Sequence, residues 1–326
     1  KCLNILSLFN TIVNRKMQKI LNFCIYKLHC NEFCVIIHLV IKMFYQKTVA
    51  AIHDISGMGK CSLTAAIPVL SSAGVSVSAL PTAILSTQTG GLNEYTYRDL
   101  TDDMIPFMNH WKKLGVRFDA VYSGFLGSVK QIDIVKEFVH TFKKDDALFL
   151  CDPAMADNGK LYDTFNDDFV CAMKELCTCA DIIVPNFTEA AMLLGLEYVE
   201  PPYTAEYVED LLKKLSETFS AKFIVLTGVD FDGRSVGAGA FDTVNKTITY
   251  SLRPRVDGMF HSTGDLFASS LLGGILNDFT VNQACDIAID FTVKSINKTV
   301  EIGGDSRFGL CFEKCLPDYM KNLELL

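Results

Sequence analysis

Polar or acidic side chains directly follow five segments that have the composition of buried strands. They are Asp54, Ser123, Asp152, Asn186 and Thr227. In a parallel sheet the carboxyl ends of the strands lie at one edge, and ligands bind just beyond that edge. We therefore expect these side chains to converge on one site. This convergence indicates a site more strongly than any single motif in the chain.

The sequence His-Ser-Thr-Gly-Asp at residues 261–265 precedes an apolar helix over Leu266–Leu276. One interpretation is structural: Ser262 or Thr263 caps the helix, and Asp265 is a first-turn acid that the helix dipole favours. The other is functional: free N–H groups at a glycine-containing helix start bind an anion, and Asp265 acts beside them as a base. The local sequence supports the two about equally.

A similar ambiguity holds for Asn186 and Glu189, which are three residues apart after a strand. The spacing is that of a capping arrangement at a helix start. The same residues could hold Mg²⁺ through carboxylate oxygen and water. Asp152, which Pro153 fixes at a strand terminus, is either part of a turn or a metal and phosphate contact.

Residues 57–62, with the sequence Gly-Met-Gly-Lys-Cys-Ser, resemble two glycine-rich motifs without matching either. A Walker A loop needs Gly in place of Asp54 and Ser or Thr in place of Cys61. A dinucleotide fingerprint needs an acid about 20 residues later, and none occurs between Asp54 and Glu94. We expect instead a tight turn that brings backbone close to a small substrate.

From Thr48 onward, short apolar runs alternate with longer helical segments, which is typical of βαβ units and a parallel sheet. We therefore expect one α/β domain. The expected strands are Thr48–His53, Val75–Leu80, Phe118–Tyr122, Ala147–Cys151, Asp181–Val184, Lys222–Leu226, Ser235–Phe241 and Thr247–Ser251. The expected helices are Cys61–Ser72, Asp102–Leu114, Val129–Phe142, Asp168–Cys179, Thr188–Leu194, Ala205–Phe219, Gly264–Leu276 and Val281–Val300.

The composition is that of a globular protein, with 49% hydrophobic and 21% charged residues among 326, and it excludes disorder, collagen and coiled coil. Residues 1–47 carry seven Lys and Arg against one acid, whereas the remainder carries 23 against 37. Because phosphate binding is driven by clustered Lys and Arg, this acidic body argues against a nucleic-acid or anionic-membrane partner.

Twelve cysteines are present, but none forms a Cys-x-x-Cys pair. Cys177 and Cys179 are separated by one residue, and Cys311 and Cys315 by three with no His nearby. These spacings predict reduced structural thiols in a cytoplasmic protein rather than a disulfide framework.

Residues 1–46 differ from the rest and are expected to be a non-native or disordered extension, with residues 47–326 forming the domain. Met43 directly precedes the first clean strand and is the expected natural start. The apolar stretch Phe33–Leu39 is too short to span a bilayer, which needs about 20 residues. The extension also lacks the single apolar core and the small-residue end of a signal peptide.

Four segments, in this order, resemble the ribokinase-like superfamily, and within it the pyridoxal/pyridoxamine (vitamin B6) kinases. They are Asp152–Tyr162, Ala180–Glu189, Arg253–Val256 and Ser262–Asp265. The resemblance covers about Thr48 to Leu316. It implies a single domain with a central, mainly parallel sheet flanked by helices on both faces. The chain departs from the family pattern at Ser262 and Ala156, where relatives usually have Gly.

The resemblance also implies roles for particular residues. Asp265 would be the base, with Thr263 and Gly264 donating backbone N–H groups to the transferring phosphoryl. The implied ATP-binding residues are Asp152, Asn186, Glu189, Thr227, Gly228, Arg253 and Val256, and Asp152 and Glu189 would hold Mg²⁺. The implied acceptor-binding residues are Asp54, Thr89, Gly90 and Asp265, although many relatives carry Ser at position 54.

The resemblance therefore implies an enzyme that uses ATP and Mg²⁺ to phosphorylate the 5′-hydroxymethyl group of pyridoxal, pyridoxamine or pyridoxine. A homodimer is implied by resemblance alone. The alternative within the same chemistry is a hydroxymethylpyrimidine kinase. An alternative of another class is a B6-binding protein without turnover, and a dehydrogenase is more distant. The chemistry itself is consistent with the residues, since phosphoryl transfer needs a positioned base, donors to the phosphoryl oxygens and a metal ion.

Overall fold

The computed structural model describes residues 45–92 and 94–326, and residues 47–326 form one compact unit. Of the expected extension over residues 1–46, all but Tyr45 and Gln46 lie outside the described residues, as does the expected start at Met43. Among the described helices, none has the length and apolar character needed to cross a membrane.

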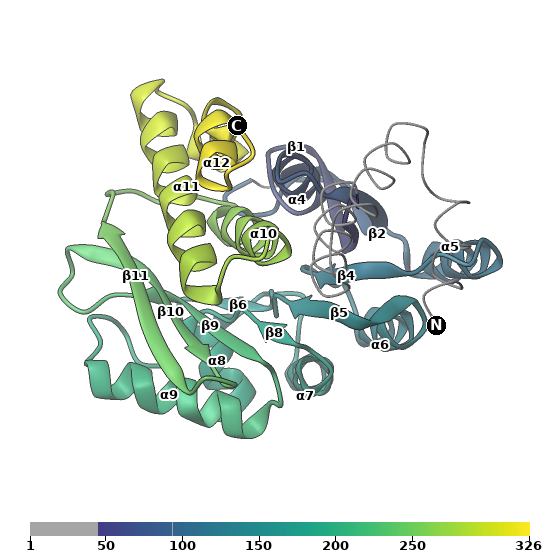
Figure 1. Ribbon diagram of the computed structural model, residues 1–326, viewed down its shortest axis with the longest axis horizontal. Helices are drawn as coiled ribbons and strands as arrows, with labels where there is room; N and C mark the ends of the chain where they lie inside the picture. Colours follow the sequence, from purple (N-terminus) through teal and green to yellow (C-terminus); the bar gives the residue numbers. More distant parts are fainter. Residues whose placement is uncertain (1–44, 93) are drawn as a thin grey trace, which may run out of the picture. The chain divides into compact units, whose positions relative to one another are not determined.

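One nine-stranded sheet runs through the described domain in the order β11-β10-β9-β8-β5-β4-β1-β2-β3 (Figure 1). The strands from β2 to β9 in this order are parallel, whereas β3, β10 and β11 at the two edges are antiparallel to their neighbours. The strands are β1 Thr48–Met58, β2 Ser76–Thr87, β3 Tyr97–Asp99, β4 Phe118–Ser123, β5 Lys143–Cys151, β8 Ile182–Ile183, β9 Phe223–Val229, β10 Ser235–Asp242 and β11 Thr247–Pro254.

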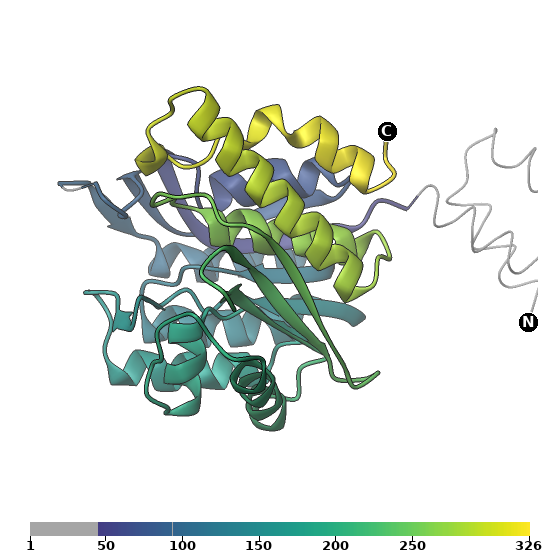
Figure 2. The ribbon, with the colours of Figure 1, turned by 90° about the vertical axis from the view of Figure 1, so that its left-hand side faces the viewer.

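Helices cover both faces of the sheet (Figure 2). One face carries α4 Leu63–Ser72, α10 Thr263–Leu276, α11 Val281–Glu301 and α12 Leu316–Asn322. The other carries α5 Thr101–Lys113, α6 Val129–Phe142, α7 Asp167–Thr178, α8 Phe187–Leu194 and α9 Ala205–Thr218. Because each central strand is buried on both faces, its sequence is a continuous apolar run, as in Val49–Ile52, which is fully buried. The expected fold class is confirmed.

The first two strands are longer than the sequence predicts. A turn was expected at Asp54, but β1 continues to Met58 through a bulge between His53 and Ile55. Two residues of β2, Thr82 and Ala83, lie opposite Asp54 there, so the extra residue of the bulge is on β2. The second strand was expected to end at Leu80, but it continues through Pro81. Proline is tolerated there because β3 pairs with β2 only from Ala83 onward, so Pro81 lies on an open edge.

A short hairpin that the sequence analysis missed lies between β5 and α7. Its strands are β6 Ala156–Asp157 and β7 Lys160–Leu161, joined by Asn158 and Gly159. Both loop residues have positive φ, 51° and 75°. An Asn-Gly pair with positive φ at both positions is the preferred two-residue hairpin loop, so the signal was present in the sequence.

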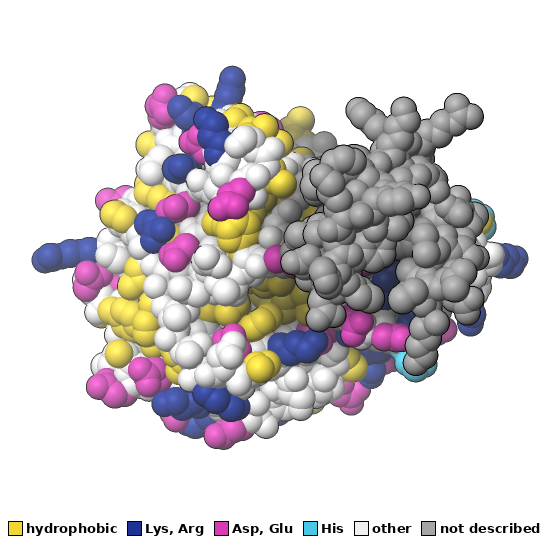
Figure 3. Space-filling model, in the orientation of Figure 1, with side chains coloured by type: hydrophobic (Ala, Val, Ile, Leu, Met, Phe, Trp, Pro, Cys, Tyr) yellow, Lys and Arg dark blue, Asp and Glu magenta, His cyan; other side chains and the backbone are white. Residues whose placement is uncertain are grey.

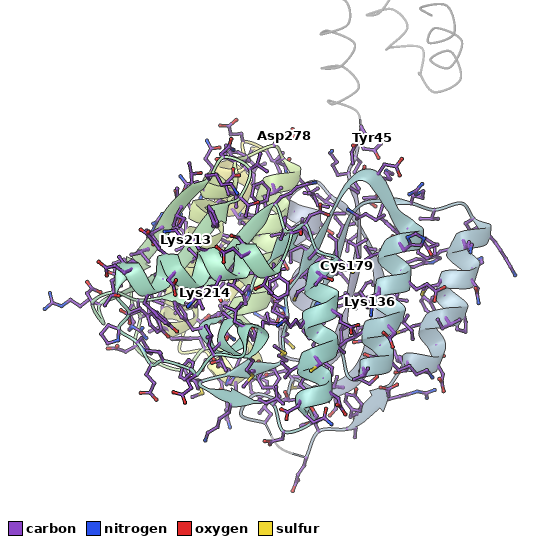
Figure 4. All side chains as sticks on the ribbon, turned by 90° about the horizontal axis from the view of Figure 1, so that it is seen from below. Tyr45, Lys136, Cys179, Lys213, Lys214 and Asp278 are labelled. Carbon is purple, nitrogen blue, oxygen red and sulfur yellow. The ribbon has the colours of Figure 1, made fainter. Side chains whose placement is uncertain are left out.

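Ion pairs link several of the surface helices. Lys136 of α6 reaches Glu175 of α7 at 2.8 Å, and Figure 4 shows Lys136 beside Cys179, the residue that ends α7. On α9, Lys213 and Lys214 pair with acids one turn earlier. On the face drawn in Figure 3, acidic and basic side chains are interspersed over the described surface.

Candidate active site

The expected convergence of acids at the carboxyl edge is present in the structure. Asp54 lies in β1 opposite the bulge of β2, Asp152 follows β5, and Asp265 lies in the first turn of α10. The carboxylates are close enough to act on one another: Asp54 raises the pKa of Asp265, and Glu189 and Asp265 raise that of Asp152. Residues from four separate parts of the chain therefore form one acidic site.

The start of α10 has no side-chain cap. Ser262 is the N-cap residue, but its side chain accepts no hydrogen bond from the helix, so the capping part of the structural interpretation is wrong, whereas Asp265 is the expected first-turn acid. The first N–H groups of a helix have no partner within the helix, and those of Thr263 and Gly264 have none elsewhere among the described residues. Nothing lies within 4 Å of the position that a Gly264 side chain would take. An anion can therefore approach the amides of Thr263 and Gly264.

Ser262 has a left-handed backbone, with φ 66° and ψ 16°. Glycine adopts this conformation at no steric cost, whereas the Cβ of Ser comes close to the backbone carbonyl oxygen and makes the conformation less favourable. The resemblance implied Gly at this position, and this backbone conformation gives a physical reason for it. The hydroxyl of Ser262 is buried and has no hydrogen-bond partner among the described residues.

The carboxyl group of Asp265 has an unusual acidity. Burial raises its pKa to about 7; a backbone hydrogen bond from Ser62 opposes this rise, and the charge of Asp54 adds to it. The helix start was expected to help keep Asp265 ionised, but burial outweighs that effect. A pKa near the working pH suits a group that must accept a proton during a reaction.

Glu189 and Asp152 form a second pair of perturbed acids. Burial raises the pKa of Glu189 to about 8, although the backbone amides of Asn186 and Met155 oppose the change. Burial, followed by the charges of Glu189 and Asp265, raises the pKa of Asp152. No Lys or Arg in the described ranges forms an ion pair with either acid. An approaching cation would relieve both shifts, since an opposite charge favours the ionised form.

Asn186 and Glu189 form a capping box at the start of α8, so the structural interpretation of this pair holds. The oxygens of Glu189 also bind backbone: Oε2 accepts from Asn186 N at 2.9 Å and Oε1 from Met155 N at 3.1 Å. The Asn186 amide donates to Ala156 O at 2.8 Å. The pair therefore fixes the loop that carries Asp152, and each Glu189 oxygen keeps one lone pair for another partner.

No described group of three or more His, Cys, Asp or Glu side chains is arranged to bind a metal by itself. Mg²⁺ commonly takes only one or two protein carboxylates and completes its shell with water and substrate phosphates. The Asp152 carboxylate accepts no hydrogen bond among the described residues, whereas both Glu189 oxygens do. The pair has the chemistry of such a site, with Asp152 the freer ligand.

The residues expected to line the nucleotide fall into two groups. Thr227 pairs with Asn186 across the sheet edge and donates its N–H to Pro185 O at 3.0 Å, next to Gly228, which has φ 83°. Thr227 and Gly228 thus lie beside the acidic site. Arg253 is turned elsewhere: its Nε donates to Asp290 of α11 at 2.6 Å.

Val256 is half-buried in the loop that follows β11. Among the described contacts, neither Val256 nor Arg253 touches the acids of the carboxyl edge. The neighbouring Arg255 forms an ion pair with Asp230. The structure therefore does not bring Arg253 and Val256 together with the other expected site residues.

The expected acceptor loop lies against the start of α10. Gln88 binds both polar backbone groups of Gly90, donating to its oxygen at 2.6 Å and accepting from its nitrogen at 2.9 Å. A Cβ added to Gly90 would lie 2.4 Å from Nδ1 of His261, so only Gly fits. Thr89 is exposed. The loop is thus held beside the segment that contains Ser262.

Two residues near the site were missed in the sequence. Ser62 ends the glycine-rich turn, and after burial has raised the pKa of Asp265 the backbone of Ser62 lowers it, so this turn acts on a carboxylate of the site. Tyr122 is fully buried at the end of β4, where the charges of Asp152 and Asp265, after burial, raise its pKa. No local signal marks Tyr122, because its position depends on the sheet register. Ser62 could have been found from its place at a strand-to-helix turn.

A family model described as phosphomethylpyrimidine kinase matches residues 59–308. The chain belongs to this family. The matched segment contains every expected site residue except Asp54, which lies in β1 before it.

Solved structures share the fold. One from Bacteroides thetaiotaomicron, named for a phosphomethylpyrimidine kinase, has a TM-score of 0.81 and 37% identity, covering 84% of this chain and 95% of that chain. A second crystal form of it, with pyridoxal, gives 0.80 and 36%, covering 86% and 96%. Pyridoxal kinase from Lactobacillus plantarum gives 0.78 and 28%, covering 85% and 98%. The fold is ribokinase-like, as the resemblance implied.

Curated relatives cover less of their own length. Pyridoxal kinase of Dictyostelium discoideum is 28% identical over 199 residues, or 56% of this chain and 62% of the relative. Pyridoxal kinase PdxY of Actinobacillus pleuropneumoniae is 29% identical over 195 residues, or 58% and 64%. The chain therefore spans less than two thirds of the length of these relatives.

Proposed function

We propose that this protein transfers the γ-phosphoryl group of ATP to the 5′-hydroxymethyl group of pyridoxal, pyridoxamine or pyridoxine. The observation that carries the proposal is the uncapped start of α10, where open backbone amides lie beside the half-buried carboxyl of Asp265. The amides of Thr263 and Gly264 would donate to the transferring phosphoryl. Asp265 would accept the proton of the attacking hydroxyl, a role that its pKa of about 7 favours.

Mg²⁺ fits the second pair of acids, because the half-buried Asp152 and the buried Glu189 form no ion pair with a cationic side chain in the described ranges. When bound, the ion would neutralise charge on the phosphate oxygens. Asp152 would hold it with its carboxylate, and Glu189 would hold the loop of Asp152 and contact the ion through water. Asn186, Thr227 and Gly228 would lie along the phosphates of ATP.

Arg253 and Val256 would contact the nucleotide only if the β11 loop approaches it. Arg253 would then have to leave Asp290 or reach the nucleotide with its other nitrogens. Asp54, Thr89 and Gly90 would contact the acceptor ring. Their position beside the start of α10 supports this assignment.

A B6 vitamer is favoured as acceptor by the Bacteroides structure with pyridoxal, which is 36% identical to this chain. The alternative, a hydroxymethylpyrimidine, is favoured by the description of the family model. Both acceptors carry a hydroxymethyl group on a nitrogen heterocycle, so the catalytic residues would be the same. The choice lies in the contacts to the ring.

A panel of acceptors tests the proposal directly. Pyridoxal, pyridoxamine, pyridoxine and hydroxymethylpyrimidine are each incubated with the protein, ATP and Mg²⁺, and ADP formation is measured. We expect the highest kcat/KM with a B6 vitamer. A preference for hydroxymethylpyrimidine would replace the proposed acceptor. Binding of a vitamer without ADP formation would favour the B6-binding protein without turnover.

We also propose that the protein acts in the reducing cytoplasm as a homodimer. All eight described cysteines are free thiols, including Cys151 and Cys177, whose sulfurs lie 3.9 Å apart in the core. The dimer is supported by the resemblance only. Thiol titration of the unfolded protein and sedimentation equilibrium test the two statements. A disulfide or a monomer would contradict them.

A further inference from the structure

Gln88 lies where three loops of the acceptor end meet. It directly follows β2, is 7% exposed and precedes Thr89 and Gly90 of the expected acceptor loop. Its backbone N–H donates to Met58 O, at the end of β1, at 3.3 Å. Its side-chain amide donates to Gly90 O at 2.6 Å and to Arg307 O, and it accepts from Gly90 N at 2.9 Å. Both donors of this buried amide are therefore used, and each binds the backbone of a loop.

The carbonyl of Arg307 belongs to a segment that is distant in sequence. It lies in the short 3₁₀ helix η1 over Ser306–Phe308, which follows α11. The first residue of η1 donates its hydroxyl to Met259 O at 2.7 Å, and the carbonyl of the last accepts from Lys60 N at 3.1 Å. The helix η1 is thus bound to the loop before α10 and to the glycine-rich turn before α4, and Gln88 binds it to the acceptor loop as well.

The acceptor loop also packs against η1 and against the segment before α10. A Cβ added to Gly91 would lie 3.5 Å from Cγ of Arg307. One added to Gly90 would lie 2.4 Å from Nδ1 of His261, four residues before Asp265. The position of the loop relative to Asp265 therefore depends on contacts that leave little free space.

We propose that Gln88 is a positioning residue that holds the acceptor loop, residues 88–91, against η1 and so sets its place beside Asp265. This inference rests on the proposed function. Among the described residues, Gln88 forms no hydrogen bond with an acid of the carboxyl edge, so its effect would pass through Thr89 and Gly90. The helix η1, which contains none of the expected site residues, would then contribute to acceptor binding.

The first test is Gln88→Met, which keeps nearly the length of the side chain and removes its three hydrogen bonds. KM for the acceptor should rise about tenfold, the size expected when one or two ordinary hydrogen bonds no longer order the loop before binding. KM for ATP should not change, because Thr227 and Gly228 lie on another strand. The effect on kcat should be small, since Gln88 does not touch the reacting atoms.

Two further variants separate this role from a structural one. Gln88→Glu keeps the size of the side chain, but a carboxylate cannot donate to the carbonyls of Gly90 and Arg307. At pH 8 it should therefore raise KM for the acceptor at least as much as Gln88→Met. The matched control is Gln283→Met, which removes the acceptor of Thr280 N in the capping box of α11. It should lower the melting temperature and leave both KM values unchanged.

The contribution of η1 is tested at Gly309, which directly follows it. Gly309 has φ 82°, and a Cβ there would lie 2.8 Å from Lys60 O, so Gly309→Ala should displace η1 from the glycine-rich turn. KM for the acceptor should rise, and the same change should have a smaller effect in Gln88→Met, where the bond from η1 to the loop is already lost. If Gly309→Ala does not fold, Ser306→Ala takes its place, because it removes the hydroxyl that binds Met259.

A wild-type KM for the acceptor in folded Gln88→Met and Gln88→Glu would overturn the inference, as would equal effects of the η1 change in both backgrounds. If the wild type itself forms no ADP with any acceptor, the proposed function fails instead. The inference is then decided by amide hydrogen exchange of the ligand-free protein. Residues 88–92 and 305–310 should both exchange faster in Gln88→Met than in the wild type or in Gln283→Met. Unchanged exchange of the two segments would refute it.

Discussion

The acidic side chains at the two edges of the sheet have opposite electrostatic surroundings. At the amino ends of β8 and β9, Asp181 is bound by Lys143 at 2.7 Å and Lys222 at 3.0 Å. Burial alone would raise the pKa of Asp181, but the two lysines and an amide lower it overall. At the carboxyl edge, Asp152 and Asp265 have raised pKa values and no lysine or arginine partner in the described ranges.

This difference separates an acid that holds the fold from acids that serve a ligand. A buried carboxylate with a cationic partner stabilises the protein, or at least costs little. A buried carboxylate without one lowers the free energy of unfolding at neutral pH, because it must lose its charge or stay ionised in a poor solvent. The unpaired acids at the carboxyl edge thus lower the free energy of unfolding of the ligand-free protein. A metal ion bound with the nucleotide would supply the missing positive charge.

The largest expected effect is on turnover in Asp265→Asn. If Asp265 is the base, kcat should fall by about 10²–10⁴, the usual contribution of a positioned acid or base. The measurement is the initial rate of ADP formation with saturating ATP, Mg²⁺ and vitamer. Asp257→Asn, in the exposed loop after β11, is the matched control and should keep its rate.

A smaller effect is expected for the metal dependence of Glu189→Gln. The loss of the carboxylate that fixes the Asp152 loop should raise the Mg²⁺ concentration for half-maximal rate by about 10–100-fold. Glu175→Gln, whose carboxylate pairs with Lys136 on the surface of α7, is the control. Wild-type Mg²⁺ dependence in Glu189→Gln would remove Glu189 from the metal site.

At the opposite edge, Asp181→Asn should lower stability and leave turnover unchanged. The loss of two lysine partners for a side chain that is 14% exposed should cost about 1–3 kcal/mol in the free energy of unfolding. Urea denaturation measures it, with Asp145→Asn, an exposed partner of Arg117, as control. A fall in kcat of the folded fraction would mean that this edge takes part in the reaction.

The pH dependence of stability should reflect the carboxyl edge. Groups whose pKa is raised on folding stabilise the protein below their unfolded pKa, and this stability is lost as pH rises through the folded value. For Asp265 and Glu189 those folded values are about 7 and about 8. The melting temperature of the ligand-free protein should therefore fall from about pH 4, where these acids ionise in the unfolded chain, to about pH 8. Asp265→Asn should flatten the part of the fall below about pH 7.

Much of the fold could be predicted from the sequence, because central strands and amphipathic helices leave strong local patterns. The helix Val129–Phe142 has its predicted bounds, since Ser128 caps it. The bulge at Asp54 could not be predicted, because it depends on pairing with β2. The hairpin loop at Asn158 carried a local signal that was not used.

The candidate site was predicted in part. Its acids follow strands, which a sequence shows, so their meeting at one edge was expected. The perturbed pKa of Asp265 was not expected, since it depends on burial and on Asp54, which is distant in sequence. The hydrogen bond from Arg253 to Asp290 of α11 could not be predicted either, because only the fold brings this helix close to Arg253.

The most direct test measures melting temperature and turnover on one preparation of Asp265→Asn at pH 8. Removing an unpaired buried charge should raise the melting temperature above that of the wild type, while kcat falls at least about a hundredfold. Stability and activity would then change in opposite directions, as expected for an acid that acts in catalysis and destabilises the fold. A lower melting temperature, with the turnover of each folded molecule unchanged, would show that Asp265 only stabilises the helix and would contradict the account.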